Sequence, residues 1–111
     1  MSISQTVRQS VRERANFSCE YCGISETDSG GELTTDHFQP QSKDGSDQAE
    51  NLVYCCFRCN TFKGDYWADE PSKTPLFNPR SNNYDEHFWL ADSGKLLALT
   101  EVGEFSIKLC G

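Results

Sequence analysis

The residues best suited to chemistry are two Cys-x-x-Cys pairs, Cys19 with Cys22 and Cys56 with Cys59, on either side of the dipeptide Asp36-His37. Two thiolates at this spacing can bind one tetrahedral ion from a tight turn or from the start of a helix. The two pairs together provide four sulfur ligands, a set that favours a structural zinc ion. A metal site around a polar Asp-His step indicates an active site.

The second cysteine pair has two candidates for its first member, because Cys55 and Cys56 are adjacent. We assign Cys56, since two residues separate it from Cys59. Cys55 then ends a strand in place of an apolar residue, where a free thiol behaves as a small hydrophobe. Cys110 has no obvious partner.

Asp36 and Asn60 can supply a carboxylate and an amide oxygen to a divalent cation of the magnesium type. Neighbouring residues of a strand point to opposite faces, so we expect Asp36 to face the metal and His37 to face the attacking water. An imidazole titrates near neutral pH and can take a proton from that water. An Asp-His step alone is more often a surface turn, but the flanking cysteine pairs favour the catalytic interpretation.

Two polar residues near this group have both a structural and a functional interpretation. Asn51 can cap the following strand, or it can tie the long loop to that strand and so position His37. Lys63 lies one helical turn after Asn60 on the same face, where it can meet a phosphate or remain a solvated lysine. His87 stands outside the cluster, and we treat it as structural.

A helix over residues 3–15, capped by Ser4, is predicted before the first cysteine pair. Arg8 and Arg12 share one of its faces and can approach a phosphate backbone, although a solvated basic face is the commoner outcome.

Next we expect a loop, a strand, a loop, a strand and a helix, over residues 25–31, 32–37, 38–50, 52–55 and 56–67. The first strand delivers Asp36 and His37 at its end, and the helix carries the second cysteine pair in its first turn. The two strands and the helix, held together by the zinc ion, are expected to form a small ββα unit.

The rest of the chain supports this unit. Prolines interrupt a connector that packs Leu76 and Phe77. Two apolar runs, 88–90 and 96–99, flank Asp92-Ser93-Gly94 and predict a hairpin, and 102–109 favours a helix. We therefore expect a small α+β protein with an N-terminal helix and a C-terminal hairpin. It forms a single domain over 1–111, with its core over 19–67 and a support segment over 75–111.

The net charge of −7 and the isoelectric point near 4.7 argue against broad attraction to nucleic acid and leave room for a protein partner. A few local cations and a bound divalent metal can still dominate close to the site. No apolar run is long enough to cross a bilayer, and the first ten residues lack the apolar core of a secretory signal. We expect a cytoplasmic protein, where six cysteines favour metal ligation over disulfides.

The ordered set of both cysteine pairs with Asp36-His37, Asn51-Leu52, Asn60 and Lys63 resembles the zinc-containing HNH endonucleases, whose core is the ββα-metal (His-Me finger) fold. The match spans Cys19 to Lys63, and the later segments 75–80 and 86–88 are similar to the tail of many bacterial members. The resemblance implies a DNA endonuclease in which His37 is the general base and Asn51 orients its loop. It also implies that Asp36 and Asn60 bind Mg2+ or another divalent ion such as Mn2+ or Ni2+. The four cysteines would then hold structural Zn2+.

Two other functions remain open at this point. A non-catalytic zinc module that binds nucleic acid or protein would depend on zinc for stability but bind no divalent ion at Asp36 and Asn60. A thiol-based redox or metal-sensing protein would hold its zinc loosely and oxidise reversibly.

Overall fold

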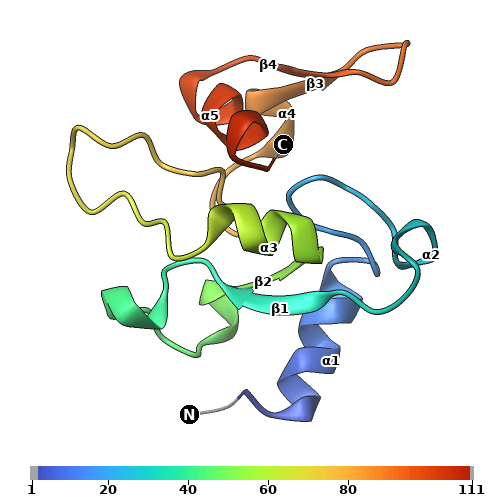
Figure 1. The fold of residues 1–111 in the computed structure, drawn as a ribbon, viewed down its shortest axis with the longest axis vertical. Helices are drawn as coiled ribbons and strands as arrows, with labels where there is room; N and C mark the ends of the chain where they lie inside the picture. Colours follow the sequence, from blue (N-terminus) through green and yellow to red (C-terminus); the bar gives the residue numbers. More distant parts are fainter. Residues whose placement is uncertain (1–2, 111) are drawn as a thin grey trace.

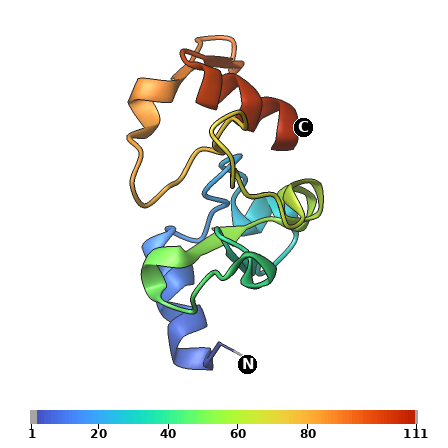
Figure 2. The same ribbon diagram turned by 90° about the vertical axis from the view of Figure 1, so that its left-hand side faces the viewer.

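The computed structural model describes residues 3–110 and arranges them in two tiers, which Figures 1 and 2 show from two sides. The core tier comprises α1 (Gln5–Arg14), α2 (Glu26–Ser29), β1 (Thr34–His37), the 3-10 turns η1 (Gln41–Lys43) and η2 (Ala49–Asn51), β2 (Leu52–Cys55) and α3 (Phe57–Lys63). The C-terminal tier comprises α4 (Tyr84–His87), β3 (Phe88–Leu90), β4 (Leu96–Ala98) and α5 (Glu101–Cys110). Helix α3 contacts both β1 and α5 and so joins the tiers (Figure 1).

Strand β2 is the centre of the core tier. It pairs antiparallel with β1, so that Asp36 lies opposite Val53 and His37 lies opposite Leu52. All four of its residues are buried, and they alternate between two apolar clusters. Leu52 and Tyr54 pack with Val11 of α1, whereas Val53 and Cys55 pack with the cysteines and the α3 side. A strand covered on both faces explains the continuous apolar run at this position.

Helices α1 and α3 begin with side-chain caps. Ser4 Oγ accepts a hydrogen bond from the Val7 amide at 3.2 Å, which confirms the predicted cap of α1. Helix α3 ends at Lys63, earlier than the predicted end at residue 67. The reason is Gly64, whose φ of 54° with ψ of −130° turns the chain out of the helix in a conformation that favours glycine.

The C-terminal tier contains the predicted hairpin and the predicted final helix. Its connection to the core tier runs through the segment before α4, where Leu76 and Phe77 are buried as expected. The Phe77 amide donates to the hydroxyl of Ser106 on α5 at 2.8 Å, and that hydroxyl donates to the Val102 carbonyl at 2.7 Å. These bonds attach the connector to α5.

Helices α2 and α4 were not predicted. Each has four residues, too few for an apolar period to show, but each begins with a capping side chain. Ser25 Oγ accepts from the Asp28 amide at 3.1 Å, and Asn83 Oδ1 accepts from the Asp85 amide at 3.0 Å. The predicted α+β class with a ββα unit is confirmed.

Within residues 3–110 no helix has the length and apolar character to cross a membrane.

Candidate metal centre and catalytic loop

The sulfur atoms of Cys19, Cys22, Cys56 and Cys59 lie within 4.8 Å of one another. The first two belong to the turn after α1, and the other two to the start of α3. The sulfurs of Cys22 and Cys56 are 3.7 Å apart, close to the ~3.8 Å edge of a tetrahedron with metal–sulfur bonds of about 2.3 Å. Four converging sulfurs fit a single soft tetrahedral cation such as zinc.

Backbone amides point at two of these sulfurs. The amides of Tyr21 and Cys22 lie 3.4 Å from Cys19 Sγ, and the amide of Cys59 lies 3.4 Å from Cys56 Sγ. Such donors favour the thiolate, the form that binds metal. Hydrogen bonds from the thiols of Cys22 and Cys59 also hold the pKa of Cys19 well below its usual range. The amide donors therefore favour the thiolate at Cys19 and Cys56, whereas the hydrogen bond to Cys19 raises the pKa of Cys22 to about 11.

Cys55 stands apart from this cluster. Its side chain is fully buried in the apolar cluster on the α3 side of β2, and burial raises the pKa of its thiol. The assignment of Cys56 as the partner of Cys59 agrees with the clustering of the sulfurs. The side chain of Cys110 lies outside the described residues.

The side chains of Asp36 and His37 contact different elements. Cross-strand partners point to the same face of a sheet. Asp36 therefore shares the face of Val53, which α3 covers, and His37 shares the face of Leu52. His37 Nε2 lies 2.7 Å from Asp47 Oδ1 in the loop between the strands. Sequence reasoning missed Asp47, because nothing in the polar loop distinguishes it from its acidic neighbours Asp44 and Glu50.

Asn51 ties the loop after β1 to the start of β2. Its Oδ1 accepts from the Gln39 amide at 2.8 Å, while its Nδ2 donates to the carbonyls of Gln39 at 3.0 Å and Ser46 at 2.8 Å. The Phe38 amide also donates to the Asn51 carbonyl at 2.8 Å. A single side chain thus closes the loop that carries Asp47 and follows His37.

Replacement of Asn51 by alanine is expected to loosen this loop, because the change leaves three backbone groups without their partner. We expect a loss of about 1 to 3 kcal/mol in the free energy of unfolding. Urea denaturation measures this loss, and faster hydrogen exchange at the Gln39 amide locates it. Gln48→Ala removes an exposed amide from the same loop and is the control. Equal stability of the two variants would contradict the structural importance of Asn51.

Asp36 Oδ2 is a buried oxygen whose contacts bear on metal binding. It lies 3.2 Å from Lys63 Nζ and makes no hydrogen bond within residues 3–110. Asn60 precedes Lys63 by one turn of α3, so the two side chains leave the same face of the helix. A carboxylate and an amide are the kinds of oxygen ligand that a hard divalent cation takes, and such an ion would bind the Asp36 oxygen that now pairs with Lys63.

Lys63 does not lie at the surface, where the sequence suggested a phosphate contact or a solvated lysine. Its side chain is 0% exposed, and Nζ donates to the His37 carbonyl at 3.0 Å besides pairing with Asp36. The reason is the packing of α3 on β1, which directs this helix face inward. The ammonium therefore braces the end of β1 and is not positioned to bind a phosphate from solvent.

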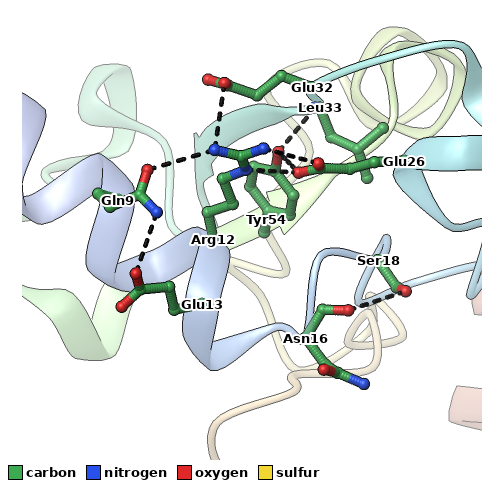
Figure 3. Close-up of polar contacts among 9 residues, drawn as sticks. All are labelled: Gln9, Arg12, Glu13, Asn16, Ser18, Glu26, Glu32, Leu33 and Tyr54. Atoms are coloured by element: carbon green, nitrogen blue, oxygen red, sulfur yellow. Dashed lines mark hydrogen bonds and ion pairs between the residues drawn. The ribbon is translucent and has the colours of Figure 1, made fainter.

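Arg12 is also committed to the fold, as Figure 3 shows. Its Nε and Nη2 donate to the two carboxylate oxygens of Glu26 at 2.7 and 2.8 Å, and Nη1 lies 3.5 Å from Glu32. The Tyr54 hydroxyl donates to Glu26 at 2.5 Å. Arg8 donates through Nε to the Ile3 carbonyl at 3.3 Å. These contacts favour the structural interpretation of both arginines over the nucleic-acid contact that we considered.

The Arg12–Glu26 pair should make the stability of the folded protein depend on pH in the acidic range. Hydrogen bonds from Arg12 and then Tyr54 lower the pKa of Glu26 from 4.5 to about 2. A carboxylate with a lowered folded-state pKa stabilises the protein fully above its unfolded pKa and loses that effect as the pH falls through the folded value. We therefore expect Glu26→Gln to be less stable than wild type above pH 4.5, by a margin that shrinks towards pH 2. Urea midpoints against pH measure the margin.

The matched control for this prediction is Glu32→Gln. Glu32 faces the same guanidinium at 3.5 Å, but its side chain is 62% exposed. Its replacement should leave the pH dependence of the wild type unchanged. A Glu26→Gln curve parallel to that of the wild type would contradict the prediction.

Comparisons with known proteins bear on this site. The family model described as HNH endonuclease matches residues 19–66, which include both cysteine pairs and the loop between β1 and β2. The CRISPR-associated endonuclease Cas9 of Corynebacterium diphtheriae is 37% identical over 91 residues, which cover 78% of this chain. The chain spans only 8% of the length of that relative. No solved structure matches significantly.

Proposed function

Because residues 19–66 belong to the HNH endonuclease family, we propose that the protein is a metal-dependent endonuclease that hydrolyses phosphodiester bonds in DNA. The observation that carries this proposal is the placement of His37. It stands at the end of β1 with Nε2 held by Asp47, next to Asp36, whose buried Oδ2 makes no hydrogen bond within residues 3–110 and is paired with the Lys63 ammonium at 3.2 Å. The comparisons support a nuclease-type function in general, and the DNA substrate and the mechanism are our proposal.

In this mechanism His37 takes a proton from a water that attacks the phosphorus atom. Asp47 and the loop closed by Asn51 hold the imidazole, and Lys63 holds the backbone carbonyl of the same residue. Asp36 and Asn60 are the residues that would hold Mg2+ or a similar divalent ion. When bound, that ion supplies charge stabilisation at the phosphate and at the leaving oxygen.

The four clustered cysteines have a separate role in this proposal. They would hold a zinc ion that does no chemistry but fixes the turn after α1 to the start of α3. The organisation as a single domain, with a core over 19–67 and support from 75–111, stays a prediction. The contacts of α3 with both tiers support it.

A second candidate function is a zinc module without catalysis that binds a protein or nucleic acid. The net charge of −7 favours this candidate, as does the commitment of Arg12 and Lys63 to internal ion pairs. Both features weaken independent attraction to DNA. The two candidates differ in the presence of a divalent site at Asp36 and Asn60.

Incubation with supercoiled plasmid and added Mg2+, Mn2+ or Ni2+ tests the proposal. Conversion to nicked or linear DNA that requires both the added ion and His37 is the expected result. Failure of the zinc-loaded protein to cut with any of the three ions would overturn the proposal and favour the binding module.

A further inference from the structure

Asp47 contacts the His37 ring from the loop between β1 and β2, and the proposed function gives it no part in the reaction beyond holding that ring. The His37 and Asp47 side chains are 16% and 26% exposed, and their contact of 2.7 Å is short for a hydrogen bond between nitrogen and oxygen. Gln41 Nε2 donates to the same Asp47 oxygen at 3.0 Å and holds the carboxylate in place. The contact is therefore part of a fixed network.

This contact determines which ring nitrogen can act as a base. An ionised carboxylate only accepts hydrogen bonds, so the atom that contacts it must carry the proton. In the neutral ring the proton is then on Nε2, and the lone pair is on Nδ1. Nδ1 makes no hydrogen bond with any residue from 3 to 110. The free nitrogen is thus the one available to a water molecule.

The loop geometry keeps Asp47 at this position. Asn51 holds the carbonyl of Ser46, the residue immediately before Asp47, at 2.8 Å. The same side chain binds both backbone groups of Gln39, two residues after His37. The Asn51 side chain therefore holds the backbone near His37 and next to Asp47. The distance between the His37 and Asp47 side chains is thus set by a closed loop and not by a flexible one.

We propose that Asp47 is a positioning residue for His37, holding Nε2–H so that Nδ1 faces the attacking water. The proposal rests on the function proposed above, because it assigns Asp47 a part in the reaction of the same histidine. When the water loses its proton to Nδ1, the ring becomes an imidazolium, and the carboxylate stabilises that charge at Nε2. The proton returns to solvent or to the leaving oxygen, and Asp47 stays ionised throughout.

The first test compares cleavage by wild type, Asp47→Ala and Asp44→Asn. Asp44 lies in the same loop and makes no side-chain hydrogen bond or ion pair within residues 3–110, and asparagine tolerates its φ of 67°. Asp44→Asn thus removes the same charge without touching His37. We expect Asp47→Ala to cut at saturating DNA about 10 to 100 times more slowly than Asp44→Asn, with unchanged DNA affinity. Equal rates would overturn the proposal.

A second measurement does not depend on activity. At about pH 8.5, where an ordinary imidazole is neutral, NMR of the zinc-loaded full chain should show a downfield, slowly exchanging proton on His37 Nε2. The chain has two histidines, so a His37→Ala spectrum assigns the signal. Asp47→Ala should lose it and Asp44→Asn should keep it. Its absence in wild type, or its survival in Asp47→Ala, would overturn the proposal.

The two measurements separate this inference from the proposed function. Loss of the Nε2 proton signal in Asp47→Ala, in a protein that cuts no DNA, would end the nuclease proposal and the catalytic role of Asp47 together. A cutting wild type whose Asp47→Ala variant cuts equally well would end only the role of Asp47. If Asp47→Ala does not fold, Asp47→Asn keeps the shape of the side chain and provides the same comparison, with a weaker uncharged acceptor.

Discussion

Replacement of His37 by alanine is expected to lower the rate of DNA cleavage by a factor on the order of 10² to 10⁴, the contribution of a general base. The folded structure should persist, because the side chain is held by loop contacts and not by the apolar core. Zinc content should also be unchanged, since His37 is not among the four clustered residues. Plasmid nicking rates, thermal unfolding and metal analysis of the same preparation test the three expectations.

His87 provides the control, because it is the other histidine of the chain. It lies at the end of α4, where its Nδ1 contacts Thr100 Oγ1 at 2.6 Å and its ring packs against Phe77. His87→Ala should therefore lower stability and retain cleavage, the opposite of His37→Ala. Loss of zinc from His37→Ala would mean that a structural ligand had been taken for a catalytic base.

Replacement of Cys59 by alanine is expected to unfold the domain in the absence of any denaturant. Zinc bound by small peptides contributes about 10 to 16 kcal/mol of folding free energy, whereas small domains have net stabilities of about 5 to 15 kcal/mol. Removing one of four ligands should thus cost most of the stability of the domain. Circular dichroism and bound-metal analysis after gel filtration measure the result.

The same substitution at Cys55 separates ligand loss from the loss of a buried thiol. Both residues are fully buried, but only Cys59 belongs to the sulfur cluster. Cys55→Ala should cost only about 1 to 2 kcal/mol and keep a full complement of metal. A stably folded Cys59→Ala protein that still binds one metal ion would contradict the assignment of the four cysteines.

Local patterns predicted the core elements well. Strand β2 occupies residues 52–55 as expected, because its apolar run is bounded by polar residues. The cysteine spacing selected the four clustered sulfurs, since that spacing is itself the geometric requirement. The bounds of a strand and the spacing of metal ligands depend on neighbouring residues, so the sequence alone could predict them.

The directions of the cationic side chains were not predictable in this way. Spacing placed Lys63 beside Asn60 on one helix face but could not tell whether that face met solvent or β1. Arg12 was likewise placed on a face whose partner, Glu26, lies 14 residues away on a helix too short to be recognised. Asp47 depends on loop closure by Asn51. Each of these contacts depends on tertiary packing between elements far apart in the sequence. The spacing of residues along one element does not show such contacts.

The contact between Cys22 and Cys56 has a consequence for the kinetics of folding. It joins residues 34 positions apart, and the segment between them carries Asp36, His37, Asp47 and Asn51. Closing a flexible chain of this length costs about 3 kcal/mol of entropy, apart from a constant. Capture of a metal ion by the four cysteines would compensate for this cost, so the supply of the ion would set the rate at which the loop between β1 and β2 is assembled. Metal scarcity would then reduce the number of active molecules and leave the turnover of each one unchanged.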